Sequence, residues 1–530
     1  MKTIQTILLT LTIAASAATQ PVPEADPPFT HFDKDNDGKV TAAELGMPAA
    51  FKAADKNGDG FVTQDEFAAH LRQRRGHAPR PKGAGANAQT EPSSIRFKFT
   101  PDYVPGKNDV SGQWMGGTEA LNLAVHKGHL YAGIGYWQDI PLYEDKPGDP
   151  WVGAQILVKQ GKDTPWKVDL NMGQRVLRAR ALRTVTFETD AQGNRLPHPV
   201  EMLLTSGMNF GSPEILVWSR VDDANQWHKV VVDRTKVGDY LVALGSHRDQ
   251  VTGVSHVFGG SRNGSVYKGV FDPAAPGKIR WEDQPEFTTR DERADTKNAE
   301  RRVMGFAEAD GALYASIRTS IYRRADGAKP DWQEVYRWPL PPADQEGWRR
   351  PEGRGLTAVP KPNGKGEMLL VALEMEQVIR RIDPANGHRA EDDFNVGAYF
   401  LKAWGHEIRS SLCMAHNRMV PYTIPATGEN LLMFGFIANP RGARSWNRSG
   451  GAGLFVRRAD GTYHHFPVED PRLDPHPVLY ATRDIAPSPW EPNVIYVCGY
   501  DATGNAALKT RALNTAWIWR GEFQQNKSKD

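Results

Sequence analysis

A pair of short apolar segments recurs seven times between residues 130 and 520 of this 530-residue chain. The first segments, most of which end in a small residue, are Leu130–Gly133, Leu203–Gly207, His256–Gly260, Leu313–Ser316, Leu369–Ala372, Leu432–Gly435 and Ile495–Gly499. The second segments, which end in an aromatic or basic residue, include Ala154–Lys159, Glu214–Trp218, Gly264–Lys268, Ser320–Arg324, Gln377–Arg381, Gly453–Arg458 and Ala516–Arg520. The first segments begin 53 to 73 residues apart, which is typical of a repeated structural unit.

Repeated units of this kind predict sheets that stack around an axis. An aromatic residue opens a third segment in five copies, namely Trp166, Trp227, Trp281, Trp332 and Tyr463. One such sheet cannot bury both of its faces alone, whereas neighbours in a ring bury each other's faces and leave only short edges. We therefore predict a mainly β fold with a seven-bladed β-propeller over residues 96–523 and a polar tail over 524–530. The segment Arg96–Thr100 is expected to close the ring by adding a strand to the last blade.

The resemblance to known propellers is one of architecture only. The repeats are longer than the ~40–45 residues of WD repeats. The sequence also lacks a recurring Trp-Asp signature and the sialidase-type pattern Ser-x-Asp-x-Gly-x-x-Trp. Six or eight blades, or a different β solenoid, remain open.

Two twelve-residue segments near the N-terminus, Asp33–Glu44 and Asp55–Glu66, place oxygen donors at alternating positions around a central glycine. Calcium takes six to eight oxygen ligands, and a glycine at the sixth position permits the sharp turn of the loop. The expected donors are Asp33, Asp35, Asp37, Lys39, Thr41 and Glu44 in the first loop, and Asp55, Asn57, Asp59, Phe61, Thr63 and Glu66 in the second. Lys39 and Phe61 would use their backbone carbonyls. This pattern resembles the EF-hand family over residues 28–72.

The resemblance implies a small α-helical EF-hand pair that binds two calcium ions. Val40 and Val62 occupy the eighth loop positions and are expected to pair in a short β bridge. The loops begin 22 residues apart, so one helix over residues 44–54, interrupted by Pro48, must serve both of them. Calcium sensors act by swinging long helices apart. The short helices here favour a structural calcium module.

The N-terminus and the segment before the propeller differ in composition from the rest of the chain. Lys2 and an apolar run that ends in small residues predict a signal peptide over residues 1–17, so the protein is expected to be exported to a periplasmic or extracellular location. No later segment is apolar enough to span a membrane. Residues 73–95 are rich in Pro, Gly and Ala and are expected to form a flexible linker. The net charge of +2 gives no reason to expect binding to nucleic acid. Cys413 and Cys498 could pair in an oxidising compartment, and the sequence leaves this open.

The innermost strand of each blade is expected directly before the first apolar segment. The expected inner segments are Thr118–Val125, Arg178–Val185, Thr252–His256, Arg301–Phe306, Arg354–Val359, Met414–Val420 and Thr482–Ala486. Five of them carry an arginine near the start, namely Arg180, Arg302, Arg354, Arg418 and Arg483, with Glu119 and His416 as polar neighbours. Guanidinium groups gathered at one mouth of the ring would suit a carboxylate or a sulfate. Alternatively, these arginines pair with acidic residues of neighbouring blades.

Two functions fit these features. In the first, an exported calcium-binding protein uses its propeller to bind an anionic polysaccharide or an extracellular protein. In the alternative, the propeller is a polysaccharide lyase acting on uronate polymers, with His256, His416 and Tyr480 as candidate catalytic residues beside the arginines. The lyase alternative rests on analogy of fold. The sequence contains no serine nucleophile elbow, phosphate-binding loop or HExxH segment.

Overall fold

The computed structural model describes two separate units, Met1–Lys82 and Gly83–Asp530. The described residues are 35, 37–45, 51, 54–55, 57–63, 66, 95–136, 152–209, 211–235, 237–289, 301–338, 352–362, 364–373, 377–404, 408–413, 418–425, 427–440, 453–470, 472, 479–501 and 515–525. The expected signal peptide (1–17) and residues 73–94 of the expected linker lie outside them.

The first unit contains a short two-stranded sheet. Strand β1 (Lys39–Val40) pairs antiparallel with β2 (Val62–Thr63), and Val40 lies opposite Val62. Both valines are fully buried. The predicted bridge between the two loops is therefore confirmed.

One short helix of this unit, α3 (Ala42–Leu45), overlaps the end of the first loop. Phe51 and Ala54 are also helical. The other residues of the expected 44–54 helix, including Pro48, lie outside the described residues, so the complete helical pair stays a prediction.

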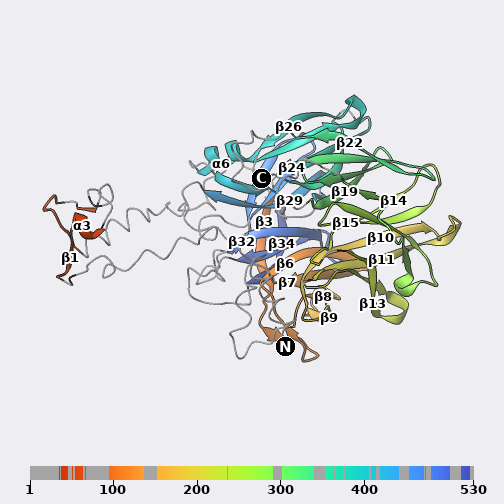
Figure 1. Ribbon diagram of the computed structural model, residues 1–530, viewed down its shortest axis with the longest axis horizontal. Coiled ribbons are helices and arrows are strands. Elements are labelled where there is room, and N and C mark those ends of the chain that lie inside the picture. The colour runs from red at the N-terminus through yellow and green to blue at the C-terminus, as the bar shows by residue number, and fades with distance from the viewer. Residues whose placement is uncertain are drawn as a thin grey trace, which may run out of the picture. The chain divides into compact units, whose positions relative to one another are not determined.

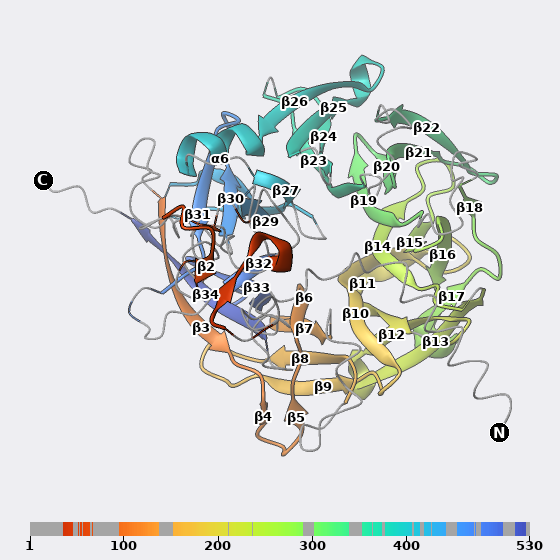
Figure 2. The same ribbon diagram turned by 60° about the vertical axis from the view of Figure 1, so that its left-hand side comes forward.

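The second unit is a seven-bladed β-propeller (Figures 1 and 2). Six of its sheets, each given from the innermost strand outward, are β6 (Glu119–His126), β7 (His129–Gly135), β8 (Gln155–Lys159) and β9 (Lys167–Asn171); β10 (Val176–Thr189), β11 (Arg195–Asn209), β12 (Glu214–Val221) and β13 (Gln226–Arg234); β14 (Leu241–Arg248), β15 (Ser255–Ser261), β16 (Ser265–Phe271) and β17 (Ile279–Trp281), with β18 (Phe287–Thr288) also on β16; β19 (Val303–Ala309), β20 (Ala312–Ile317), β21 (Ser320–Ala325) and β22 (Asp331–Arg337); β23 (Gly353–Pro360), β24 (Glu367–Leu373), β25 (Val378–Asp383) and β26 (Arg389–Asn395); and β27 (Ile408–Cys413), β29 (Asn430–Pro440), β30 (Gly453–Arg457) and β31 (Tyr463–Pro467), with β28 (Val420–Thr423) also on β29. The inner strands contact each other in the order β32, β6, β10, β14, β19 and β23, and the sixth sheet contacts its neighbours through β27 with β24 and through β29 with β32.

The seventh sheet joins the two ends of the propeller. From the inside outward it contains β32 (Leu479–Pro487), β33 (Val494–Asp501), β34 (Ala516–Gln525) and β3 (Ile95–Tyr103). Strand β3 pairs with β34 from Ile95 opposite Gln525 to Tyr103 opposite Ile518. The predicted closing strand at residues 96–100 is thus confirmed, and β34 extends two residues into the segment expected to be a tail.

One of the expected inner strands was wrong, and another is described only in part. In the third sheet the inner strand is β14, and residues 252–254 belong to the turn that joins it to β15. In the sixth sheet β27 and β28 both pair with β29; residues 414–417 of the expected segment lie outside the described residues, and Val420 begins β28.

The second unit also contains smaller elements outside the seven sheets. Strands β4 (Lys107–Asn108) and β5 (Trp114–Met115) form a hairpin, and helix α6 (Val396–Trp404) follows β26. The short 3-10 helices are η2 (Asp222–Ala224), η3 (Pro276–Lys278) and η5 (Pro384–Asn386). Within the described part of the chain, no helix has both the length and the apolarity needed to cross a bilayer.

The basic residues that end the second apolar segments hold neighbouring sheets together. In the fourth sheet Arg324 binds Glu286 of the third sheet, with Nε and Oε1 2.8 Å apart, and the indole N–H of Trp332 donates to the same carboxylate at 2.9 Å. The same combination of a cation, an aromatic donor and a carboxylate recurs as Lys159, Trp166 and Asp102; as Arg220, Trp227 and Asp169; and as Arg457, Tyr463 and Asp393. We call these four groups the blade clamps. They give the repeated basic and aromatic positions of the sequence a structural reason.

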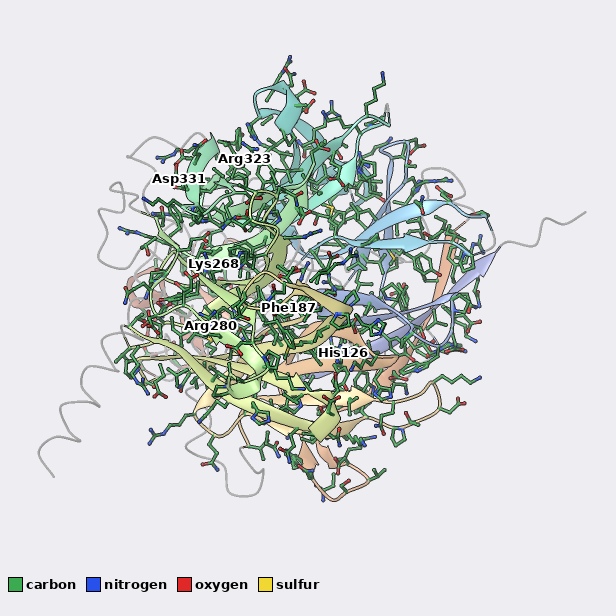
Figure 3. All side chains as sticks on the ribbon, turned by 90° about the vertical axis from the view of Figure 1, so that its right-hand side faces the viewer. His126, Phe187, Lys268, Arg280, Arg323 and Asp331 are labelled. Carbon is green, nitrogen blue, oxygen red and sulfur yellow. The ribbon has the colours of Figure 1, made fainter. Side chains whose placement is uncertain are left out.

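Two buried histidines make a second type of contact between sheets. His126, at the end of β6 (Figure 3), lies 3.0 Å from Glu201 and 2.9 Å from Asp222. His247, at the end of β14, lies 2.9 Å from both Glu308 and Asp326. These carboxylates outweigh the burial of the ring and raise the pKa of His247.

Cys498 of β33 is a buried free thiol, so it is not in a disulfide.

Candidate functional sites

A β-bulge interrupts the beginning of the inner strand in all seven described sheets. A bulge inserts a residue without a partner in the ladder and changes the direction of its side chain. In β10 one bulge falls between Ala179 and Ala181, and in β32 one falls between Thr482 and Asp484. The inserted residues are therefore Arg180 and Arg483, two of the predicted ligand-binding arginines.

Glu119 joins arginines from the two sheets on either side of its own. This carboxylate, the first residue of β6, is fully buried. It binds Arg178 of β10, and its Oε1 lies 2.7 Å from Nε of Arg483 in β32. Burial raises the pKa of Glu119, but the two guanidiniums outweigh it and the net shift is downward. Arg483 thus acts in part as the inter-blade contact that the sequence left as an alternative.

Glu352 holds a second pair of arginines. Arg302, directly before β19, binds it with both arms of the fork at 2.9 and 2.6 Å. Arg354 of β23 lies 3.4 Å from the same carboxylate. Both predicted arginines therefore face one acidic residue, which lies just before β23.

Arg180 has no such carboxylate. Only 2% of the residue is exposed, its Nε has no hydrogen-bond partner, and no ion pair is present for it among the described residues. Burial, together with the charges of Arg178, Arg302 and Arg354 and against the opposing effect of Tyr240, lowers the pKa of Arg180 to about 9. Since these neighbours come from different sheets, the guanidinium lies in the middle of the ring. A buried cation among like charges is costly unless an anion accompanies it.

An apolar cluster lies beside this cation. It contains Tyr240, Val242, Met208 and Met304, all buried. Val242 and Met304 are the residues inserted by the bulges of β14 and β19. The middle of the ring thus combines a cationic side with an apolar side.

The remaining predicted residues lie elsewhere or outside the described residues. Arg418 is near Arg183 and is not among the charges that act on Arg180. His256 lies in β15 opposite His247, at the far end of β14 from Tyr240. Eight residues of extended chain separate those ends by roughly 20–25 Å. His416 lies outside the described residues, and Tyr480 is described only by its backbone in β32.

His256 has the properties of a buried neutral imidazole. It is 8% exposed, and its Nδ1 has no hydrogen-bond partner. Burial lowers its pKa to about 4, and the nearby Lys268 and Arg324 add to this effect. The structure therefore places His256 beside a blade clamp and apart from Arg180.

Three residues near the arginines in the middle of the ring were not predicted from the sequence. Arg178 was within an expected inner strand but was not selected, and Glu352 and Tyr240 lie just before inner strands. A signal was present, since Arg178 and Arg180 alternate on one strand and so share a face. No local signal marks the bulges that direct these side chains to a common place.

The two loops of the first unit have matching internal contacts. In the first loop the Lys39 N–H donates to Asp37 at 2.8 Å, and Thr41 Oγ1 donates to Glu44 at 2.8 Å. In the second loop, Phe61 and Thr63 make the equivalent contacts to Asp59 and Glu66 at 2.9 and 2.8 Å. Gly38 and Gly60 have φ values of 82° and 87°, the left-handed conformation for which glycine is favoured.

The donor set of these loops fits calcium. The predicted ligands are carboxylate, amide, hydroxyl and carbonyl oxygens, the hard ligands that calcium prefers. Among the described residues no group of three or more His, Cys, Asp or Glu side chains is close enough together to hold a metal, and Asp33 lies outside these residues. The pattern of donors, rather than a preformed cage, identifies the loops.

Comparison with known proteins separates the two units. The EF hand family matches residues 29–47 and 49–71. The sequence has no match among curated proteins. Among solved structures, similar chains include an ancestral GH74 enzyme (10% identity, TM-score 0.46, 82% of this chain and 52% of that chain), Sqt1 of Saccharomyces cerevisiae (11%, 0.37, 78% and 97%) and an auxiliary nutrient binding protein from Bacteroides thetaiotaomicron (11%, 0.34, 70% and 77%).

These structural likenesses are distant. The chain spans about half the length of the GH74 enzyme chain that it matches. Identities and TM-scores this low carry no argument about the function of the propeller. Its loop pattern, the paired strands β1 and β2 and the family match together identify residues 29–71 as an EF-hand segment.

Proposed function

We propose that the first unit binds two calcium ions, one in each twelve-residue loop, and serves as a structural module of an exported protein. The two sets of matching contacts and the Val40–Val62 pair support two loops of the same kind. The signal-like residues 1–17 support export. Filled loops would hold this small unit in a fixed conformation.

Replacing Glu44 and Glu66 together by Gln is expected to abolish calcium binding. Each change replaces the carboxylate that would bind the ion through both oxygens with an amide. Isothermal titration of the full chain with calcium should show two sites for the wild type and none for the double variant. Lys39→Gln is the matched control, because position seven uses the backbone carbonyl, and it should keep both sites. Full binding by the double variant would refute the assignment.

We propose that the propeller binds a carboxylate-bearing glycan through Arg180. The buried guanidinium without a carboxylate partner is the observation that supports this function. Neighbouring Arg302 is only partly buried, so the cationic cluster is not sealed from solvent. The apolar cluster of Tyr240, Val242 and Met304 would face the less polar side of a sugar ring.

Replacing Arg180 by Gln is expected to weaken binding of galacturonate oligomers by about 10- to 100-fold. A hydrogen bond to a charged group contributes about 1.5–3 kcal/mol, which corresponds to this range. Titration calorimetry on the full chain would measure it. Arg234→Gln, which removes an arginine with 68% of its side chain exposed, is the control and should bind like the wild type.

The ultraviolet absorbance of the same mixtures tests the lyase alternative. A lyase would produce unsaturated uronate, which raises the ultraviolet absorbance during incubation with the polymer. Binding without an absorbance change would support a binding propeller. Equal affinity of the wild type and Arg180→Gln would overturn the role of Arg180, and binding only to a protein partner would overturn the glycan assignment.

A further inference from the structure

A third arginine, Arg183, follows Arg180 along β10. Arg183 is partly exposed, and no hydrogen bond or ion pair of its side chain is present among the described residues. Its charged neighbours are Arg418, from the sixth sheet, and Asp484 of β32. As with Arg180, neighbours from sheets on other sides of the ring place this guanidinium near the middle. Strand β10 therefore carries two unpaired guanidiniums in succession.

Asp484 is the carboxylate next to Arg183 and Arg418 at this second position. Its two oxygens accept hydrogen bonds from the backbone N–H groups of Leu123 and Ile485, both at 2.9 Å. Arg418 is also partly exposed and has no ion pair among the described residues. Burial lowers the pKa of Arg183 to about 9, Arg418 contributes to this shift and Asp484 opposes it. Two guanidiniums beside one carboxylate leave a net positive charge, which favours a second anion-binding position.

The spacing of the two positions follows from strand geometry. Because Arg180 is the inserted residue of a bulge, it lies between two and three ladder steps from Arg183, which corresponds to roughly 7–10 Å along β10. The two guanidiniums also have different charged neighbours, Arg178, Arg302 and Arg354 for Arg180 but Arg418 and Asp484 for Arg183, so we assign them to two positions. A chain of sugars that carries several carboxylates could contact both.

We propose that the ligand of the propeller is a linear oligouronate, which places one carboxylate at Arg180 and another, about 7–10 Å along β10, at Arg183 and Arg418. This inference rests on the proposed glycan-binding function. The second contact needs no further loss of translational freedom once the first is made, so affinity rises with oligomer length.

The test is a length series of galacturonate monomer, dimer, trimer and tetramer, titrated into the full-length wild type, Arg180→Gln, Arg183→Gln and the exposed control Arg234→Gln. For the wild type and the control, the affinity should rise about 100-fold from the monomer to the best oligomer. Arg183→Gln should bind the monomer like the wild type but lose most of the gain with length. Arg180→Gln should lose affinity for the monomer as well. Arg183→Lys keeps the charge and should retain most of the gain.

The outcomes separate this inference from the proposed function. If the monomer binds at Arg180 and the oligomers bind no more tightly, the two-position inference is wrong and the proposed function stands. If no uronate binds to the wild type, both fail. If poly-glutamate of equal charge binds more tightly than the galacturonate series, the glycan assignment is overturned. Equal thermal midpoints of the wild type and Arg183→Gln would show that this variant is folded. If Arg183→Lys, like Arg183→Gln, fails to bind longer oligomers more tightly, the charge of Arg183 has no role in the second position.

Discussion

Replacing Arg324 by Met is expected to lower the free energy of unfolding by about 3–5 kcal/mol, the usual cost of removing one partner from a buried ion pair. The Arg324 side chain is 1% exposed and lies between the third and fourth sheets. It binds Glu286 at 2.8 Å and Asp249 at 2.7 Å. Met has a similar length but would leave Asp249 without this cation and Glu286 with Lys268 alone. The loss of the charge, more than the loss of volume, therefore decides the result.

Arg323→Met is the matched control for this prediction. Arg323 is the neighbouring residue of the same strand, and its side chain is exposed (Figure 3). Surface substitutions of this kind change stability by about 0.5 kcal/mol or less. Urea unfolding followed by tryptophan fluorescence should give a lower midpoint for Arg324→Met only. Equal midpoints of the two variants would show that the blade clamp contributes no stability.

The pH dependence of unfolding gives a second comparison between the wild type and Arg324→Met. Burial of Asp249 raises its pKa, but backbone N–H groups and Arg324 outweigh this effect, and the net shift is well below the usual value. The pKa of Glu286 is also lowered, since Arg324 and Lys268 outweigh its burial. A carboxyl with a lowered pKa stabilises the fold above its unfolded pKa of about 4 and loses this contribution as the pH falls. The wild type should therefore lose stability below about pH 4, and Arg324→Met should lose less.

The sequence predicted the parts of the fold that depend on local pattern. Apolar segments such as Leu130–Gly133 and Ile495–Gly499 became strands next to the inner ones, because a buried strand needs an apolar run wherever it occurs. The Val40–Val62 bridge followed from a fixed loop position. These features need no knowledge of which residues meet across the ring.

The errors and omissions depend on contacts across the ring. The expected third inner strand at residues 252–256 was wrong because a turn separates β14 from β15. The length of this turn cannot be predicted from the spacing of the other repeats. Arg180 and Arg483 were both selected, yet one is unpaired and the other binds Glu119. The difference arises from the residues that the other sheets present to each bulge. Tertiary structure therefore separates a structural arginine from a candidate ligand-binding one.

Replacing Phe99 by Ala is expected to lower the free energy of unfolding by about 3–5 kcal/mol, the usual cost of removing a large aromatic side chain from a core. Phe99 lies in β3, the strand that closes the ring, and is 3% exposed. Its ring covers Gly521 of β34 so closely that a Cβ built there would lie 2.6 Å from it. It also belongs to the core cluster that joins the last two sheets, together with Val420 and Leu454. A cavity here weakens both the closing strand and the interface between sheets.

Lys98→Ala distinguishes this effect from a general sensitivity of β3. Lys98 is the preceding residue, and its side chain is exposed on the other face of the strand. It should leave the urea midpoint close to that of the wild type. Hydrogen exchange should also rise in β3 and β34 of Phe99→Ala before it rises in other sheets, because release of the closing strand exposes the ladder between them. Equal midpoints for Phe99→Ala and Lys98→Ala would mean that the ring does not depend on this closure for its stability.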